Sequence, residues 1–247
     1  MEIYSEFANR VDWEPGLKLQ LWLSKRFLKT YLANTSQSAA NLDLMEIGCG
    51  NGNLGIVAGD MGFKSYVGVE PNSTLVEIAK SRIEHGSVVQ FKLPDLDPSL
   101  YCSADLAVAI HVIEHAPTGY EAREWIRGLA ATVRPGGHIL IVSPDVRDFK
   151  ENFWSIDWSH CFPTTVTNLS QILVDLGLEI TIAKKFRFGS INGFASSVAW
   201  LLSFMVPGRF LDLVFRRYFQ RELGTGLKVA LFWGVTFIVA QKLGENP

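Results

Sequence analysis

The 247-residue chain has few cysteines and no strong excess of charge of either sign. Its three cysteines, Cys49, Cys102 and Cys161, lie far apart and form no Cys-x-x-Cys pair. This spacing argues against a disulfide framework or a structural zinc site and fits a reducing compartment. The formal net charge is −2, so overall charge gives no reason to expect a nucleic-acid partner.

The N-terminus lacks the pattern of a secretory signal peptide. Glu2 and Glu6 stand where such a signal needs a basic segment followed by an apolar core. We therefore expect a cytoplasmic protein. Hydrophobic residues make up 48% and charged residues 19% of the chain, which is typical of a globular protein with a sizeable core. The length allows one domain, or one domain with an insertion.

A glycine-rich stretch follows a short apolar run near residue 45. Leu42–Ile47 breaks into Gly48, Gly50 and Gly52, and then into a segment that can start a helix. This order predicts a buried strand, a tight turn and a helix N-terminus. Glycine permits positive φ and close approach of a ligand, and the helix start offers unpaired N–H groups. The stretch predicts an adenosine-like ligand, but Gly50–Gly55 also fits the Gly-x-Gly-x-x-Gly fingerprint of dinucleotide enzymes.

Glu70 ends the next apolar run, Ser65–Val69, roughly 20 residues beyond the glycines. An acid at this separation is where the ribose hydroxyls of a nucleotide are bound, because a carboxylate accepts two hydrogen bonds. Such an acid is common to more than one class of nucleotide-binding α/β enzyme. It supports an adenosine ligand without naming it.

Three further landmarks carry a family resemblance. Glu46 with Gly48, Gly50 and Gly52 resembles motif I of the class I S-adenosylmethionine-dependent methyltransferases. Asp105 and Val112–His115 resemble the start and end of strand four in the small-molecule members, and Arg134–Gly137 resembles the turn before strand five. The resemblance implies a Rossmann-like α/β fold, with a seven-stranded, mostly parallel sheet, helices on both faces and an antiparallel last strand. It also implies S-adenosyl-L-methionine as cofactor.

The resemblance assigns further cofactor contacts residue by residue. It puts Asp95 against the adenine amino group, Leu96 along the adenine ring and His111 near the methionine or adenine moiety. Some relatives with acidic residues after strand four bind a divalent cation. This chain has His111 at the first such position, so no metal is expected.

The acceptor side is expected between Pro144 and Thr164. The block Asp157-x-x-His160-x-Phe162-x-Thr164 resembles a stretch of methyltransferases that act on sugars and other small acceptors. Methyl transfer to a hydroxyl needs an aligned acceptor and a base. His115 and His160 are the two candidate bases, and the sequence does not rank them.

The chain divides into four expected parts: a helical leader (1–41), the cofactor-binding core (42–187), an apolar helical insertion (188–232) and the final strand with a tail (233–247). Within the leader, Trp13–Gly16 is expected to form a turn ahead of its amphipathic helix. The insertion includes a basic amphipathic helix over 209–221, which predicts an acceptor lid, a homodimer face or peripheral membrane contact through 188–221. A transmembrane span is not expected, because 188–208 carries several polar residues.

These features predict an S-adenosylmethionine-dependent methyltransferase. The expected reaction is O-methylation of a small-molecule or saccharide acceptor, including a lipid-linked one. Two alternatives stay open: an NAD-dependent oxidoreductase that uses the same glycine turn, and a non-catalytic partner protein with this fold.

Overall fold

The computed structural model describes residues 14–187 and 234–244. The first 13 residues of the leader and the expected insertion lie outside these described residues. No helix in the described parts of the chain combines the length and the hydropathy that a membrane span requires.

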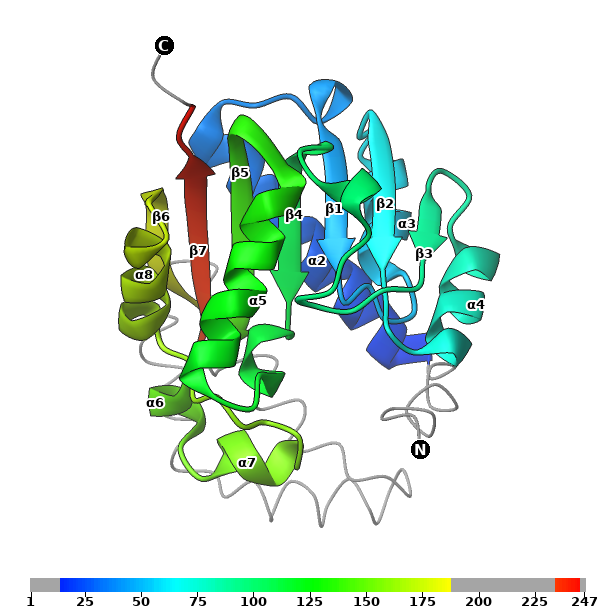
Figure 1. Cartoon of the computed structure of the whole chain (residues 1–247). Helices are drawn as coiled ribbons and strands as arrows, with labels where there is room; N and C mark the ends of the chain where they lie inside the picture. The colour runs from blue at the N-terminus through cyan, green and yellow to red at the C-terminus, as the bar shows by residue number, and fades with distance from the viewer. Residues whose placement is uncertain (1–13, 188–233, 245–247) are drawn as a thin grey trace, which may run out of the picture.

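The described residues form a seven-stranded sheet in the order β3-β2-β1-β4-β5-β7-β6 (Figure 1). Parallel pairing joins β1 (Asp43–Ile47), β2 (Ser65–Val69), β3 (Ser87–Val89), β4 (Ala104–Ile110) and β5 (Val133–Pro144). The last strand, β7 (Gly234–Lys242), is antiparallel to both its neighbours, β5 and β6 (Leu178–Arg187). The expected fold class is confirmed.

Helices cover both faces of this sheet. Figure 1 shows α5 (Gly119–Thr132) in front of the sheet and α2 (Glu14–Thr35) behind it. One apolar cluster joins the sheet to α2, α3 (Asn53–Asp60) and α4 (Ser73–Arg82). A second cluster joins it to α5 and α8 (Val166–Asp175).

The central strands are largely apolar because both of their faces are covered. In β4, Leu106 and Val108 belong to the first cluster, whereas Ala107 and Ala109 belong to the second. All four are fully buried. Successive side chains of a strand point to opposite faces, so a strand between two helical layers reads as a continuous apolar run.

Short helices connect these elements at the ends of the strands. They comprise the helices α6 (Val146–Phe149) and α7 (Asn152–Ile156), and the 3-10 turns η1 (Ala39–Asn41), η2 (Pro98–Leu100) and η3 (Ile113–His115). Of these, η3 follows β4, and α6 and α7 follow β5. They therefore lie at the carboxyl ends of the parallel strands.

Three local expectations need adjustment. α2 begins at Glu14, so Pro15 and Gly16 belong to its first turn, where proline is tolerated. The apolar run 88–91 predicts a strand, but β3 ends at Val89 and is shorter than this run. The predicted turn at Arg134–Gly137 lies within β5, where Gly136 has the φ of +83° that a type II turn requires.

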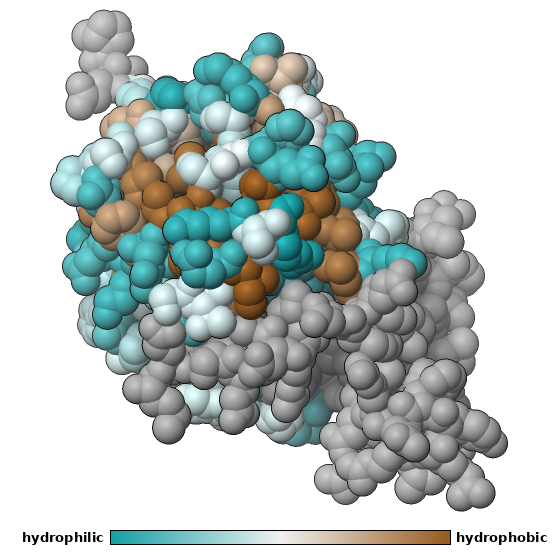
Figure 2. Space-filling view, turned by 90° about the vertical axis from the view of Figure 1, so that its right-hand side faces the viewer, coloured by the Kyte–Doolittle hydropathy of each residue, from teal (hydrophilic) through white to brown (hydrophobic). Residues whose placement is uncertain are grey.

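The edge of the sheet at β3 is short. Figure 2 shows the side of the molecule that carries α4 and β3, where apolar surface gathers near the middle with hydrophilic residues around it. β3 has three residues and pairs with β2 alone. A short edge strand exposes few unpaired backbone groups, which limits edge-to-edge pairing with other chains.

Candidate functional site

The glycine turn follows β1 and has the backbone that its sequence predicts. Gly48, Gly50 and Gly52 have φ of +75°, +51° and +82°, a region that other residues rarely adopt. A Cβ on Gly48 would lie 2.5 Å from Cγ2 of Val112, in the segment after β4. A Cβ on Gly50 would meet nothing within 4 Å. The turn thus packs tightly at its first glycine and opens at its second.

Glu70 lies directly against this turn. One carboxylate oxygen, Oε2, accepts the backbone N–H of Gly50 at 2.9 Å, and the other, Oε1, accepts that of Asn72 at 3.0 Å. Burial raises the pKa of Glu70, and the two hydrogen bonds oppose that rise. The glycine turn and the acid after β2 therefore share one site.

α3 begins at the end of the turn and is held there by side chains from other helices. Its N-cap, Gly52, has no side chain to cap the first N–H groups, which leaves them for a ligand. Arg82 of α4 donates to the carbonyl of Asn51 at 2.6 Å and to Oδ1 of Asn53 at 2.9 Å. Gln20 of α2 accepts from Nδ2 of Asn53 at 2.5 Å. Two neighbouring helices therefore fix the turn from outside.

Glu46 lies within the core beside the turn. Its carboxyl Oε2 accepts the hydroxyl of Tyr66 on β2 at 2.5 Å, and the residue is 5% exposed. Burial raises the pKa of Glu46 to about 8 against the hydrogen bond from Tyr66, and the charge of Glu70 adds to the rise. Glu46 is therefore largely protonated at neutral pH.

Asp95 and Leu96 occupy the loop after β3. Asp95 is exposed. Leu96 is buried in the apolar cluster that also contains Ile47 and Val69, the last residues of β1 and β2. This part of the loop therefore belongs to the carboxyl end of the sheet, where open α/β sheets bind ligands.

His111 and Glu114 follow β4, which lies beside β1 in the sheet. His111 has a φ of +56°, and its Nδ1 lies 3.1 Å from Oε1 of Glu114. The other oxygen of Glu114 accepts the hydroxyl of Ser143 at 2.8 Å. Burial alone raises the pKa of Glu114, but the His111 hydrogen bond and the charges of His111 and His115 outweigh it, so the pKa is lowered. A buried carboxylate thus lies at the centre of the second half of the site.

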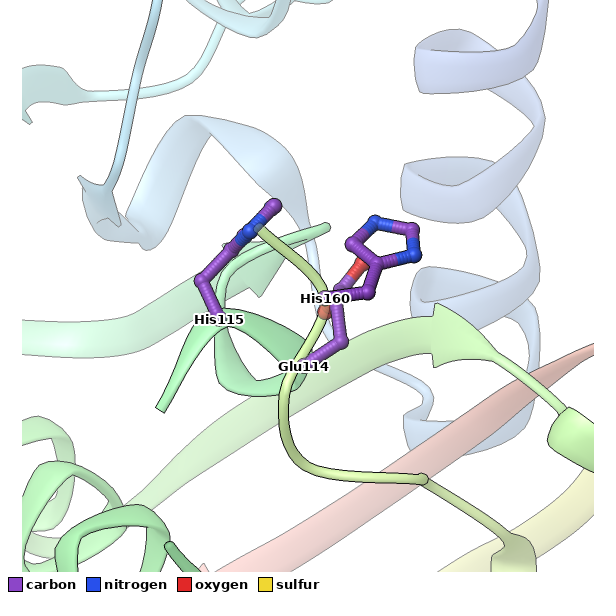
Figure 3. Close-up of side chains that lie close together, drawn as sticks. All are labelled: Glu114, His115 and His160. Carbon is purple, nitrogen blue, oxygen red and sulfur yellow. The ribbon is translucent and has the colours of Figure 1, made fainter. Parts of the chain in front are cut away.

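His115 and His160 lie next to each other above Glu114 (Figure 3). Their ring centroids are 4.9 Å apart. Nδ1 of His160 lies 2.6 Å from the carbonyl oxygen of Phe153, which only accepts, so Nδ1 carries the proton. Burial lowers the pKa of His115, while Glu114 opposes that change. The fold therefore brings together the two histidines named by the sequence. They come from distant segments, since Ser159, the residue before His160, lies 44 positions from His115 in the sequence.

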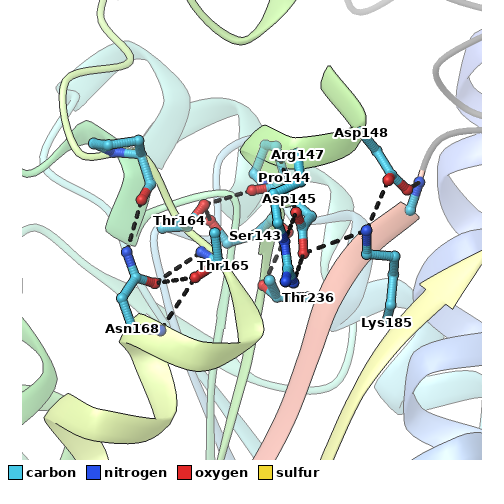
Figure 4. Close-up of polar contacts among 12 residues, drawn as sticks. Ser143, Pro144, Asp145, Arg147, Asp148, Thr164, Thr165, Asn168, Lys185 and Thr236 are labelled. Atoms are coloured by element: carbon cyan, nitrogen blue, oxygen red, sulfur yellow. Dashed lines mark hydrogen bonds and ion pairs between the residues drawn. The ribbon is translucent and has the colours of Figure 1, made fainter. Parts of the chain in front are cut away.

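A polar network behind this pair joins β5 to the segments on either side of it (Figure 4). The hydroxyls of Ser143 and Thr164 lie 2.8 Å apart, and Thr164 donates to the carbonyl of Pro144 at 2.5 Å. Further along, Lys185 of β6 donates to Asp148 at 2.7 Å, and Asp148 accepts the N–H of Gly234 at 2.9 Å. The network fixes the chain that leads from β5 to His160.

Glu114, His115 and His160 could also hold a metal ion. Each offers a ligand atom, and these atoms lie within 4.8 Å of one another. Two imidazoles and one carboxylate form a donor set that suits zinc and related metals. Within residues 14–187 and 234–244, no other group of three such side chains meets the same distance criterion.

Comparison with known proteins identifies the family. The model of a methyltransferase domain matches residues 21–182, which is more than half of the chain. The chain belongs to this methyltransferase family. The match confirms the resemblance to the class I S-adenosylmethionine-dependent enzymes and the cofactor that it implies. It favours a methyltransferase over the NAD-dependent alternative.

One curated relative is the ribosomal protein L11 methyltransferase of Thermosipho africanus. The two sequences are 32% identical over 114 residues, which cover 46% of this chain and 42% of that protein. The matched part of this chain thus spans less than half the length of this relative. Its substrate is a property of that protein.

Solved structures share the fold at low sequence identity. A SAM-dependent methyltransferase from Archaeoglobus fulgidus has a TM-score of 0.56 and 21% identity, with 88% of this chain and 94% of that chain covered. A chain in a complex with the Trm112 methyltransferase activator of Haloferax volcanii has a TM-score of 0.66 and 15% identity, with 99% and 97% covered. The [4+2]-cyclase SpnF has a TM-score of 0.60 and 18% identity, with 89% of this chain and 81% of that chain covered. These likenesses concern the fold alone.

The described residues fit an S-adenosylmethionine site. The segments after β1 and β4 touch at Gly48 and Val112, and neighbouring strands whose crossovers diverge form the switch point at which α/β sheets bind nucleotides. Gly50 faces open space, Glu70 borders it, and the start of α3 offers unpaired N–H groups.

Several side chains of the site were not named from the sequence. Tyr66, Arg82 and Ser143 reach their partners across large sequence separations, and no local pattern indicates these contacts. Phe153 takes part through its backbone carbonyl, which its residue type does not indicate. Ser159 is different, because it occupies an unassigned position inside the Asp157–His160 block. The available signal was its spacing from Asp157, because an aspartate side chain can accept a hydrogen bond from the backbone N–H two residues further along the chain.

Proposed function

We propose that the protein transfers a methyl group from S-adenosylmethionine to a hydroxyl of a small-molecule or saccharide acceptor. In this proposal Glu46, Gly48, Gly50, Gly52, Glu70, Asp95, Leu96 and His111 form the cofactor site. His115 or His160 accepts the proton of the acceptor hydroxyl. The observation that supports it most strongly is the pair of imidazoles, 4.9 Å apart, after the carboxyl ends of β4 and β5.

The chain's own residues have two tasks in this reaction: to orient the donor and to remove a proton. When bound, S-adenosylmethionine supplies a methyl group on a cationic sulfur, which is a good leaving group. The glycine turn and Glu70 orient the donor, since backbone N–H groups and a carboxylate match a nucleoside and its ribose hydroxyls. An imidazole beside the acceptor removes the hydroxyl proton, for which a neutral histidine is available near pH 7.

Exposed indoles support a saccharide or another flat, partly apolar acceptor. Trp158 is 81% exposed and directly precedes Ser159, and Trp154 is 48% exposed and follows Phe153. Aromatic faces contribute apolar contact area to ligands and also carry a polar edge. Both side chains precede His160 in the chain by a few residues, in the part of the protein where the acceptor is proposed to lie.

The test is methyl transfer from radiolabelled S-adenosylmethionine to a panel of hydroxylated small molecules and saccharides. We expect His115→Gln or His160→Gln to lower kcat about 100-fold or more, because general-base catalysis contributes that much. S-adenosylhomocysteine should bind both variants as it binds the wild type. His85→Gln, at an exposed site beyond α4, is the matched control and should keep full activity. Full activity in both site variants would refute the histidine base.

Dialysis against a chelator separates the base from a metal at the same side chains. We expect activity to survive, with no metal retained by mass spectrometry, since the sequence lacks the acid that metal-binding relatives carry at position 111. Loss of activity that returns only with added zinc or manganese would instead assign Glu114, His115 and His160 to a cation.

A further inference from the structure

A hydrogen-bonded series of three side chains leads to His115 from the segment after α7. The hydroxyl of Ser159 donates to Oδ1 of Asp157 at 2.6 Å, and the backbone N–H of Ser159 donates to the same oxygen at 2.9 Å. The same hydroxyl oxygen lies 2.9 Å from Nδ1 of His115. Ser159 therefore connects a carboxylate to the imidazole.

The hydrogen-bond donors and acceptors along this series determine which ring nitrogen of His115 carries the proton. Burial raises the pKa of Asp157, but the two hydrogen bonds from Ser159 and the charges of His115 and His160 outweigh it, so the pKa is lowered. The carboxylate is thus ionised at neutral pH and can only accept. The single hydroxyl proton of Ser159 goes to Asp157, so the bond to His115 requires a proton on Nδ1. In neutral His115, Nε2 then carries the lone pair.

His160 has the same tautomer but a different partner. Its Nδ1 donates to the Phe153 carbonyl, which is a neutral group. The series from His115 ends on the carboxylate of Asp157, and the charges of Glu114 and Asp157 both act on His115. A proton that arrives on Nε2 of His115 creates a positive charge, which nearby negative charges favour. His115 is therefore better supported as the base than His160.

We propose that Ser159 is a positioning residue. Its hydroxyl donates to Asp157 and accepts from Nδ1 of His115, and so keeps Nε2 of His115 as the proton acceptor in methyl transfer. This inference rests on the proposed function for its catalytic part. In the step concerned, the O–H bond of the acceptor breaks, its proton moves to Nε2, and the resulting imidazolium later releases a proton to water. In a catalytic triad a carboxylate bonds directly to the catalytic histidine and orients it. Here the hydroxyl of Ser159 lies between the carboxylate of Asp157 and His115.

The tautomer can be measured without any ligand. Long-range ¹H–¹⁵N correlation spectra of the full chain with ¹⁵N-labelled histidine distinguish a protonated Nδ1 from a protonated Nε2. The signal of His115 is the one lost in His115→Gln. We expect a protonated Nδ1 in the wild type, and a protonated Nε2 there would overturn the proposal whatever the variants do.

Three substitutions complete the test. Ser159→Ala should increase the share of His115 that carries its proton on Nε2, whereas Ser159→Thr keeps a hydroxyl and should keep the wild-type tautomer. Ser155→Ala removes an exposed hydroxyl from the neighbouring helix α7 and should change nothing. An unchanged His115 signal in a folded Ser159→Ala protein would refute the role of Ser159.

The pH dependence of kcat provides the catalytic readout. The charged and titratable groups that face His115 are Glu114 from η3 and Asp157 and His160 from the segment after α7. Loss of the link to Asp157 destabilises the imidazolium, so Ser159→Ala should shift the acid limb to lower pH and lower kcat by about tenfold or more, with KM little changed. A changed tautomer with an unchanged pH profile would show that Ser159 orients His115 but that His115 is not the base. That result would overturn the catalytic part of this inference, leave the positioning of His115 intact and leave His160 as the candidate base of the proposed function.

Discussion

At the scale of single residues, Glu70 supports the glycine turn and is also proposed to bind the nucleoside. Its two carboxylate oxygens accept the N–H groups of Gly50 and Asn72, so it shapes the turn before any ligand arrives. A carboxylate has about four acceptor positions, which leaves capacity for ribose hydroxyls beside these two bonds. The same side chain can therefore support the loop and bind the nucleoside.

Glu70→Gln should weaken binding of S-adenosylhomocysteine about 10- to 100-fold, because hydrogen bonds to a charged group contribute ~1.5–3 kcal/mol. Glutamine also offers only one acceptor oxygen for Gly50, Asn72 and the ligand. Isothermal titration calorimetry measures the change. Glu77→Gln, at an exposed position of α4, is the matched control. An unchanged Kd in Glu70→Gln would exclude Glu70 from the cofactor site.

Glu46 makes stability depend on pH. Its pKa is about 8 in the folded chain against an ordinary value of 4.5, so between these values the unfolded chain loses a proton that the folded chain keeps. The free energy of unfolding therefore falls as the pH rises through this window. The stabilisation from this group is complete below about pH 4.5 and is lost as the pH rises through about 8.

Glu46→Gln should remove this dependence, because its amide stays neutral and its carbonyl can still accept from Tyr66. The difference between wild type and variant should change by up to about 1.4 kcal/mol per pH unit between pH 5 and 8, in favour of the variant at high pH. Urea unfolding at several pH values measures it, with Glu77→Gln as the control. Parallel stability curves for wild type and Glu46→Gln would contradict a buried, protonated Glu46.

At the scale of elements, strands were predictable where burial dictates composition. The final strand was expected at 234–242 and is observed as Gly234–Lys242, since its apolar run is bounded by a glycine and a lysine. β3 is shorter than expected because Phe91 is apolar for a different reason: it packs against the second cluster from the loop. The hydrophobic pattern indicates which residues are buried, but backbone pairing with a neighbouring strand decides which of them belong to a strand.

Within the site, residues tied to local motifs were predictable and residues tied across the fold were not. The sequence pointed to Glu70 and to the His115–His160 pair, because each follows a strand or lies in a recognisable block. It did not indicate that Ser143 of β5 would bond to Glu114 after β4. That contact depends on the register that sets Ile110 opposite Val142, which only the assembled sheet defines.

A substitution in the polar network at the end of β5 tests whether this network holds together the elements around the proposed acceptor side. Asp145 is fully buried and Asp148 is 5% exposed, and the Lys185 amine lies 3.7 Å from the first and 2.7 Å from the second. Lys185→Met removes a cation from two buried carboxylates and should lower the free energy of unfolding by about 2–3 kcal/mol. Lys64→Met removes an exposed pair with Asp43 and should cost about 0–1 kcal/mol. Equal effects of both substitutions in urea unfolding would contradict a structural role for the network.

At the scale of the whole molecule, the fold brings together groups that arrive in separate stretches of the chain. β1 and β4 are neighbours, and the chain leaves them toward opposite ends of the sheet. The glycine turn follows β1, whereas His111 and His115 follow β4. Because Gly48 and Val112 touch, the two halves of the site form one surface at the carboxyl ends of the strands.

This arrangement predicts that a ligand spanning both halves stabilises the whole domain. S-adenosylhomocysteine at 100 times its Kd should add about 2.7 kcal/mol, because a ligand bound only by the folded state shifts the unfolding equilibrium by mass action. For a chain of this size that is a rise in Tm of roughly 5–10 °C. NAD at the same concentration should give little or no rise, since the methyltransferase match favours the sulfonium cofactor over a dinucleotide. Differential scanning calorimetry with each ligand measures both shifts. A larger rise with NAD than with S-adenosylhomocysteine would mean that the glycine turn and Glu70 serve a dinucleotide, and the assigned cofactor site would be wrong.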